Sequence, residues 1–343
     1  MKKTAVFGAG SWGTAIALLL ARAGHKVFLI GRDEEKINTM KNSKENTYYL
    51  PGVTLPDNII PSSDLQDIYA DVVFFCVPSH AVRESCRLLK PYLRPGCIIV
   101  NTAKGLEENT FLRLSQVIAQ ELPGHPLAVL SGPSHAEEVG KDVVTAVVVA
   151  SQDIEIAETI QDLIMTSKFR VYTNRDLIGV EMGGALKNII ALCSGILEGM
   201  ESRDNTKAVL MTRGLAEITR LGVALGGKPE TFYGLAGIGD LIVTCTSPHS
   251  RNLRAGRALG TGKPLNEVLK EVGMVVEGVR ITKIAYELSK RLNITMPITE
   301  QAYYVLFKDL SPQEALAELM MRGKKHETEI KEFLGTTNNK LTP

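Results

Sequence analysis

A glycine-rich turn near the start of the chain has the residue types and spacing of a phosphate-binding loop. Gly8, Gly10 and Gly13 form a G-x-G-x-x-G pattern between an apolar run, residues 4–7, and an apolar helical pattern, residues 14–21. A glycine-rich turn alone is common in α/β proteins, but strand, turn and helix in this order indicate dinucleotide binding. Gly8 would allow the tight turn, Gly10 would let a pyrophosphate approach, and Gly13 would let the helix pack closely on the strand. We therefore expect a dinucleotide at this helix N-terminus, where free N–H groups and the helix dipole favour an anion.

The turn after the second apolar run, residues 27–30, bears on which dinucleotide is bound. An acidic residue at this strand end binds the ribose 2′-hydroxyl of NAD, whereas a nearby arginine suits the 2′-phosphate of NADP. Gly31 stands at the expected strand end, and Arg32 follows it directly. Asp33 argues for NAD because it lies about 20 residues after the last glycine of the motif, although both charges could simply be solvated. We expect NADP(H), with NAD(H) as an alternative or second cofactor.

Lys104 is a candidate for a side chain that acts in the same crevice. It follows an apolar run that ends at Asn101, and in an open α/β sheet the ligand lies beyond the carboxyl ends of the strands. Residues 78–80 and 132–136 follow other apolar runs in the same way. We therefore expect Lys104 to point into the crevice, although most lysines in loops are solvated.

Charged residues within apolar stretches mark the second half of the chain. Glu181 and Lys187 lie in the otherwise apolar residues 178–196, where a charged side chain must reach water or be paired. Asp240 stands between a pair of glycines and an apolar run, a position that equally suits a helix N-cap.

A polar triplet precedes a further helical pattern. Ser250, Arg251 and Asn252 lie directly before an apolar-periodic stretch, residues 253–259. Hydroxyl, guanidinium and amide groups at a helix start can bind a phosphate, but a plain N-cap with solvated arginines would look the same. The triplet is therefore a candidate phosphate site.

The elements that must position these residues fall into two groups. Apolar runs alternate with helical patterns up to residue 175, which predicts a Rossmann-type, doubly wound and mainly parallel sheet. The runs are residues 4–7, 27–30, 71–78, 96–102 and 127–133, with outer strands at 146–150 and 169–172, while the polar residues 41–63 are expected to form a loop. From residue 176 the patterns are helical, so we expect domains at 1–175 and 176–332 and a frayed tail at 333–343.

Composition limits the classes of function. The chain has 343 residues, 44% hydrophobic and 22% charged, with a net charge of +1, which gives no reason to expect nucleic acid or an anionic membrane as a partner. Its five cysteines form no C-x-x-C pair and its six histidines lack zinc-like spacing, so we expect reduced thiols and no metal. The N-terminus imitates a signal peptide, but cleavage would remove the glycine motif, and no run of eighteen apolar residues exists. We expect a cytoplasmic protein.

Seven motifs occur in the order found in one enzyme family. They are GAGSWG at 8–13, NTAKG at 101–105, SGPS at 131–134, ALKN at 185–188, GIGDL at 237–241, SRN at 250–252 and VVEG at 275–278. With these motifs, the chain resembles the bacterial NAD(P)-dependent glycerol-3-phosphate dehydrogenases from its first strand to about Arg322. The resemblance implies a homodimer whose active site lies between a Rossmann domain and an all-helical domain.

The resemblance also implies a reaction and roles for residues. The family interconverts sn-glycerol 3-phosphate and dihydroxyacetone phosphate, a phosphorylated three-carbon pair, and can supply glycerol 3-phosphate for phospholipid synthesis. Lys187 matches the general acid/base on the substrate C2 oxygen, with Lys104 and Asp240 beside it. The substrate positions are matched by Lys104, Gly132, Ser134, Lys187, Asp240, Ser250, Arg251 and Asn252. In addition to the three glycines of the turn, the residues that match the family's cofactor-binding positions are Ser11, Trp12, Arg32, Lys104, Ala136, Arg251, Val275 and Glu277.

Two other readings of the sequence remain open. A related two-domain dehydrogenase, acting on β-hydroxyacids or 6-phosphogluconate, would share the fold plan and differ in its substrate motifs. A nucleotide-binding sensor would use the fold without catalysis, but it would not need Lys187, Lys104 and Asp240 together.

Overall fold

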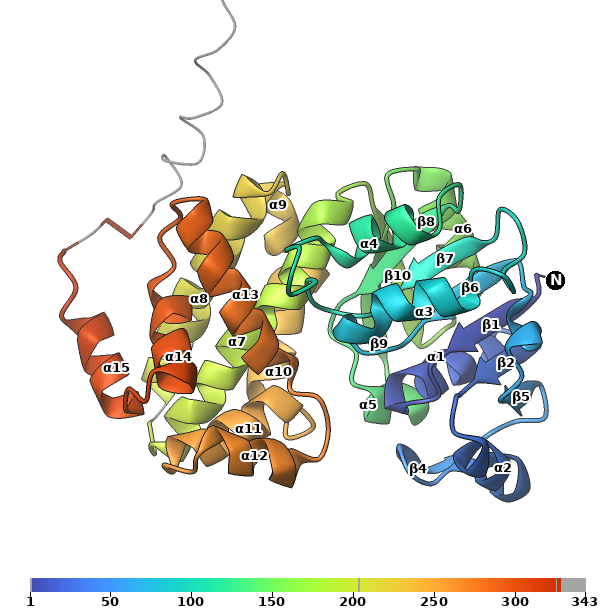
Figure 1. Ribbon diagram of the computed structural model, residues 1–343, viewed down its shortest axis with the longest axis horizontal. Helices are drawn as coiled ribbons and strands as arrows, with labels where there is room; N and C mark the ends of the chain where they lie inside the picture. Colours follow the sequence, from blue (N-terminus) through green and yellow to red (C-terminus); the bar gives the residue numbers. More distant parts are fainter. Residues whose placement is uncertain (1, 203, 325, 328–343) are drawn as a thin grey trace, which may run out of the picture.

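The computed structural model describes residues 2–202, 204–324 and 326–327. A sheet-based N-terminal domain and a helical C-terminal domain lie side by side (Figure 1). This arrangement confirms the expected fold class. The tail expected at 333–343 lies outside the described residues, as do the last residues of the expected second domain.

The N-terminal domain is built on an eight-stranded sheet in the order β10-β9-β8-β7-β6-β1-β2-β5. Its strands are β1 (Thr4–Phe7), β2 (Val27–Ile30), β5 (Ile59–Ser62), β6 (Val72–Phe75), β7 (Ile98–Asn101), β8 (Leu127–Ser131), β9 (Thr145–Ala150) and β10 (Phe169–Asn174). All neighbours pair in parallel except β8 and β9, which are antiparallel. Phe7 pairs with both Ile30 and Phe75, and Phe75 pairs with Asn101, so the carboxyl ends of four strands form one edge.

The expectation of a loop at residues 41–63 is wrong. This stretch contains the end of α2 (Glu34–Ser43), a small hairpin of β3 (Glu45–Asn46) and β4 (Leu50–Thr54), and the edge strand β5. Pro61 lies inside β5, opposite Leu29. Proline is tolerated there because an edge strand has one side without ladder hydrogen bonds, so the proline that suggests a loop is compatible with a strand.

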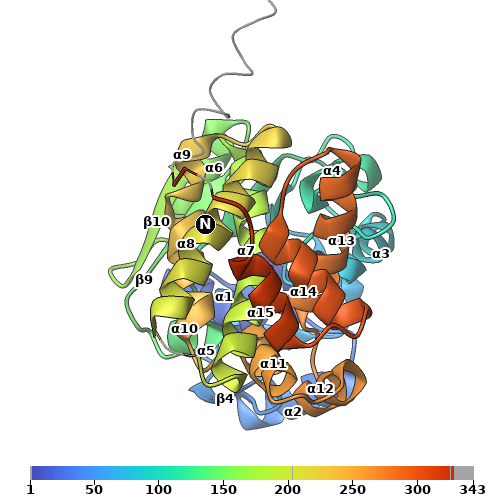
Figure 2. The same ribbon diagram turned by 90° about the vertical axis from the view of Figure 1, so that its left-hand side faces the viewer.

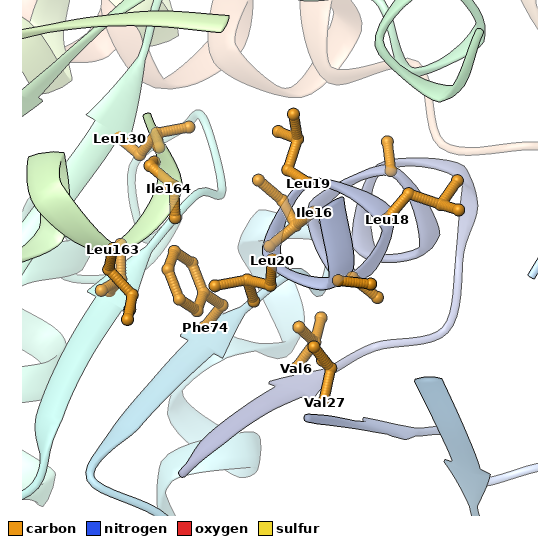
Figure 3. Packing of buried hydrophobic residues seen from close by; sticks show 14 of the residues in the cluster. Val6, Ile16, Leu18, Leu19, Leu20, Val27, Phe74, Leu130, Leu163 and Ile164 are labelled. Carbon is orange, nitrogen blue, oxygen red and sulfur yellow. The ribbon is translucent and has the colours of Figure 1, made fainter. Parts of the chain in front are cut away.

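Helices cover both faces of the sheet. Successive strand residues face opposite layers: Val6 and Phe74 pack under α1 (Ser11–Arg22) and α6 (Ile154–Ile164), whereas Phe7 and Phe75 pack against α3 (Val82–Leu89) and α4 (Leu114–Glu121). Figure 3 shows the α1 side, where Leu20 of α1 lies beside Phe74 of β6. Burial on both faces explains why the strands read as continuous apolar runs. The remaining helical turns of this domain are η1 (Leu65–Ile68), η2 (Ser79–Ala81) and α5 (Ala136–Gly140).

The C-terminal domain is organised around the helix α7 (Leu177–Gly199), which the other helices surround (Figure 2). They are α8 (Asp204–Ala224), α9 (Pro229–Phe232), the π-helical turn η3 (Leu235–Gly239), α10 (Asp240–Thr246), α11 (Arg251–Gly260), α12 (Leu265–Val272), α13 (Glu277–Arg291), α14 (Pro297–Phe307) and α15 (Pro312–Met320). By length and composition α7 could cross a membrane, but 89% of its most apolar window is buried inside the protein. Apart from a few polar residues such as Glu181 and Lys187, this helix is apolar on all sides because it lies in a core.

Glycines bring α11 into backbone contact with α7. A Cβ on Gly256 would lie 2.0 Å from the carbonyl oxygen of Leu192, and a Cβ on Gly195 would lie 2.1 Å from that of Leu253. No side chain fits between the two helices at these points. The close crossing holds the start of α11, where the polar triplet lies, against the middle of α7, where Lys187 lies.

We predict that Gly256→Ala destabilises the protein. Alanine favours a helix by about 0.8–1 kcal/mol over glycine, but its methyl group would meet rigid backbone, and overpacking of this kind costs about 1–3 kcal/mol or more. The cost of the clash should exceed the gain in helix propensity, so urea unfolding should show a lower free energy of unfolding. Gly323→Ala is the matched control, because a Cβ at Gly323 meets nothing within 4 Å. Equal stability of the two variants would contradict the role of Gly256.

Candidate active site

The glycine turn between β1 and α1 has a shape that leaves an open face. Gly8 has a φ of +109°, and a Cβ there would lie 2.5 Å from the carbonyl oxygen of Cys76, so the turn needs glycine. A Cβ on Gly13 would lie 1.8 Å from the carbonyl oxygen of Gly8, which fits close packing of helix on strand. A Cβ on Gly10 would meet nothing within 4 Å. Gly10 therefore lies beside open space at the N-terminus of α1, where a phosphate group fits.

Asn46 supports this turn and was missed from the sequence. Its Nδ2 donates to the carbonyl oxygen of Ala9 at 3.0 Å and to Oγ1 of Thr14 at 2.7 Å, and that hydroxyl donates to the carbonyl oxygen of Gly10 at 2.8 Å. Asn46 is buried in β3, within the stretch expected to be a loop. Without the hairpin, nothing distinguishes it from an ordinary loop asparagine.

Lys187, Asp240 and Lys104 form a cluster where the two domains meet, in which Lys187 and Asp240 are buried and Lys104 is half-buried. Nζ of Lys187 donates to Oδ1 of Asp240, and Nζ of Lys104 donates to Oδ2 of the same carboxylate at 2.6 Å. Thr244, one turn further along α10, accepts a hydrogen bond from Lys187 at 2.6 Å. The structure thus brings together the three residues that the motifs suggested as a unit, and it adds Thr244, which the sequence analysis missed.

The three charges set one another's ionisation. The pKa of Lys187 is lowered to about 7, chiefly by burial; Asp240 acts in the opposite direction, and the positive charge of Lys104 adds to the lowering. Burial tends to raise the pKa of Asp240, but the two lysines outweigh it and hold this pKa below its usual value. The cluster therefore keeps a carboxylate ionised beside an amine that gains and loses its proton near neutral pH.

Gly132 connects this cluster to the loop after β8. Gly132 has a φ of +132°, and its carbonyl oxygen accepts from Nζ of Lys104 at 3.2 Å and from Oγ of Ser134 at 3.0 Å. Ala136 begins α5, which is fixed to α1 because Arg22 donates to the carbonyl oxygen of Val139 at 2.8 Å. The loop that follows β8 is therefore anchored at both ends.

The polar triplet before α11 is held in different ways. Ser250 caps the helix, since its Oγ accepts from the backbone N–H of Leu253 at 3.2 Å. The Asn252 side chain is buried; it donates to Oδ1 of Asn188 at 2.8 Å and accepts from the N–H of Gly278 at 2.9 Å. Arg251 is exposed at the first residue of α11, and no described residue forms an ion pair with it. Its guanidinium is thus available to an anion at this helix start, as is that of the exposed Arg254 in the same turn.

The candidate cofactor residues are spread along the sheet edge. Ser11, Trp12 and Val275 are half-buried, and Arg32 is exposed. Glu277, at the start of α13, accepts from the backbone N–H of Ser79 at 3.1 Å and from its hydroxyl at 2.8 Å. Because Ser79 begins the helical turn after β6, Glu277 ties the helical domain to the carboxyl edge of the sheet.

Two acidic residues have structural partners. Asp33 accepts from the backbone N–H of Lys36 at 3.1 Å and caps α2. Glu181 accepts from Arg113 at 2.7 Å and from the N–H of Ser115 at 2.9 Å, so this buried charge is paired. Glu181 also joins α7 to the start of α4. Among the described residues, no group of three His, Cys, Asp or Glu side chains could hold a metal ion.

We predict that Asp240→Asn destabilises the protein more at pH 6 than at pH 9. Removing one partner of a buried ion pair costs about 3–5 kcal/mol, and without the carboxylate the already lowered pKa of Lys187 should fall further. A lysine whose pKa is lower in the folded state than in the unfolded state costs stability at low pH, and this cost disappears as pH rises towards its ordinary pKa.

Urea unfolding at the two pH values measures this effect. Asp153→Asn is the control, because Asp153 is an exposed cap of α6 that accepts from the N–H of Glu155 and asparagine can cap equally well. A loss of stability in Asp240→Asn that is the same at both pH values would contradict the coupling to Lys187.

Sequence comparisons place both halves of the chain in one family. Residues 3–157 match the family model of the NAD-dependent glycerol-3-phosphate dehydrogenase N-terminus, and residues 176–317 match that of the C-terminus. A glycerol-3-phosphate dehydrogenase [NAD(P)+] of Desulfitobacterium hafniense is 63% identical, over 96% of this chain and 94% of the relative. One of Moorella thermoacetica is 58% identical, over 95% of this chain and 97% of the relative.

A solved structure gives the same result. The crystal structure of glycerol-3-phosphate dehydrogenase from Coxiella burnetii is 40% identical, with a TM-score of 0.90 over 94% of this chain and 99% of that chain. Sequence, motif order and fold agree along nearly the whole length. The chain therefore belongs to the family of NAD-dependent glycerol-3-phosphate dehydrogenases.

Proposed function

We propose that this protein is an oxidoreductase that interconverts sn-glycerol 3-phosphate and dihydroxyacetone phosphate with NAD(P) as cofactor. The observation that carries the proposal is the Lys187–Asp240–Lys104 cluster beside the carboxyl edge of the sheet, with Lys187 and Asp240 buried. Relatives that are 63% and 58% identical bear the name of this activity. A purely binding protein would gain nothing from burying these charges, because burial of charge is costly.

The chain's own residues would handle the proton in this reaction. When bound, the dinucleotide supplies or accepts the hydride. Reduction of the ketone also requires a proton at the C2 oxygen, and Lys187 would donate it; in the reverse direction neutral Lys187 would accept it. A group with a pKa of about 7 serves both directions near neutral pH. Asp240 and Thr244 would hold the lysine nitrogen in place while the proton moves.

Other residues would hold the two ligands. The open face beside Gly10, the N-terminus of α1 and the exposed Arg32 suit the phosphates of a dinucleotide. Glu277, Val275, Ala136, Ser11 and Trp12 would complete that site. Arg251, beside Ser250 and Asn252 at the N-terminus of α11, would bind the substrate phosphate, and Lys104, Gly132 and Ser134 would line the rest of the substrate site.

NADP(H) is proposed as the preferred dinucleotide. Arg32 is exposed after β2 and can reach a 2′-phosphate, whereas Asp33 is already engaged as the cap of α2. We further propose that the protein forms a homodimer in the cytoplasm, that its domains span residues 1–175 and 176–332, and that its product feeds phospholipid synthesis.

Oxidation of NADPH and NADH in the presence of dihydroxyacetone phosphate tests the proposed activity. The loss of cofactor absorbance should require the phosphorylated ketone, and β-hydroxyacids and 6-phosphogluconate should not support the reverse reaction. Tight binding of NADPH without turnover of any of these substrates would favour a nucleotide sensor instead.

We predict that Arg32→Ala weakens NADPH more than NADH. A hydrogen bond to a charged group contributes about 1.5–3 kcal/mol, so the Michaelis constant for NADPH should rise by roughly tenfold or more while that for NADH changes little. Asp33→Asn, which keeps the helix cap, is the companion variant and should leave both constants nearly unchanged. An unchanged Michaelis constant for NADPH in Arg32→Ala, or weaker NADH in Asp33→Asn, would contradict this assignment.

We predict that Arg251→Ala lowers kcat/KM for dihydroxyacetone phosphate by about tenfold to a hundredfold. Arg251→Lys should restore only part of this loss, because an ammonium group cannot form the two parallel hydrogen bonds of a guanidinium. Dihydroxyacetone, which lacks the phosphate, is the control substrate, and its slow turnover should fall far less. Equal losses with both ketones would show that Arg251 does not bind the phosphate.

A further inference from the structure

His135 has a buried ring nitrogen that no described residue satisfies. Its Nε2 is shielded from solvent and has no hydrogen-bond partner within the described part of the chain. A buried polar atom without a partner costs free energy, so such an atom in a site calls for an explanation. The family motifs assign the flanking residues, Ser134 and Ala136, but leave His135 without a role.

His135 is near both the Lys187–Asp240–Lys104 cluster and the residues that precede the candidate phosphate site. Lys187, Lys104 and Asp240 all act on its charge, together with Glu137, its neighbour in sequence. On another side its ring centroid lies 6.0 Å from that of His249, which precedes Ser250 and Arg251 in the chain. A substrate that reached from Lys187 to Arg251 would pass along this ring.

The surroundings keep this ring neutral. Burial lowers the pKa of His135, and the positive charge of Lys187 lowers it further. Glu137 acts in the opposite direction, and the smaller effects of Lys104 and Asp240 oppose each other, so the net shift is downward. A neutral imidazole carries one N–H donor and one acceptor nitrogen. It can therefore donate to an anion without placing a third positive charge next to the two lysines.

A phosphate group has several acceptor oxygens, so it can take donors beyond those of the polar triplet. The side chain of Asn252 already bonds to Asn188 and Gly278, whereas Ser250 accepts a hydrogen bond as the cap of α11 and keeps its O–H as a donor. At the other end of the substrate, the ketone oxygen would be served by Lys187. A donor that lies beside this lysine and beyond it, towards α11, is best placed for the phosphate.

We propose that His135 binds the phosphate of the substrate, with Nε2–H donating a hydrogen bond to a phosphate oxygen. This inference rests on the proposed function and adds a residue that determines its specificity. The phosphate selects the tautomer that carries the proton on Nε2, which gives the buried nitrogen its partner.

Three variants separate this role from a structural one. His135→Phe keeps a flat ring without nitrogen, and His135→Gln keeps an N–H donor at similar reach. His25→Phe is the matched control, because His25 is also half-buried with an unpartnered ring nitrogen but lies in the turn before β2. For each variant kcat and KM are measured with dihydroxyacetone phosphate and with dihydroxyacetone at saturating NADPH.

The expected change lies in KM for the phosphorylated ketone. His135→Phe should raise this KM by about tenfold to a hundredfold, the effect of losing a hydrogen bond to a charged group. The turnover of dihydroxyacetone should stay within about twofold of the parent, His135→Gln should recover most of the loss, and His25→Phe should match the parent. An unchanged KM in His135→Phe, or equal losses with both ketones, would overturn the proposal.

A binding measurement keeps this inference separable from the proposed activity. In the parent, sn-glycerol 3-phosphate should raise the unfolding temperature, because a ligand that binds the folded state stabilises it. The same concentration should raise it less in His135→Phe and as much in His25→Phe. Absence of turnover in the parent would refute the proposed activity, whereas equal stabilisation of parent and His135→Phe would refute the role of His135.

Discussion

The buried contact of two lysines with one carboxylate is the constraint on which the rest of the structure depends. Lys187 comes from α7, Asp240 from the start of α10 and Lys104 from the loop after β7, so the cluster exists only when both domains are in place. Charges removed from water are tolerated only when they are paired and hydrogen-bonded. Thr244 and the carbonyl oxygen of Gly132 supply the additional partners.

The packing around α7 follows from this constraint. The charged cluster at the middle of α7 must be surrounded by tightly packed helices that hold its side chains in place. Glycines make this packing possible because they allow the backbone of α11 to contact the backbone of α7. Polar joints then fix the domains to each other: Glu181 holds the start of α4, and Glu277 holds the turn after β6. In both contacts, a glutamate carboxylate from the helical domain accepts a hydrogen bond from a backbone N–H of the sheet domain, near the carboxyl edge of the sheet where the proposed ligands would lie.

Much of this arrangement can be predicted from the sequence, and the failures have physical causes. Buried parallel strands are apolar on both faces, so seven of the eight strands stood out, and the glycine spacing fixed the turn before α1. The edge strand β5 was missed because Pro61 is compatible with an edge but typical of a loop. The antiparallel pairing of β8 and β9 leaves no local pattern. Thr244, Asn46 and His135 gain their roles only through contacts with residues distant in sequence.

The most direct test of this account is the pH dependence of kcat/KM for sn-glycerol 3-phosphate oxidation, which reports ionisation of the free enzyme. In the parent it should rise through pH 7, where Lys187 loses its proton. Lys104→Met should move this rise to higher pH because it removes a positive charge that lowers the pKa of Lys187. Ionisation of the substrate phosphate is common to both enzymes. A rise that stays at the same pH in Lys104→Met, or that appears only near the ordinary lysine value of 10.5, would contradict the account.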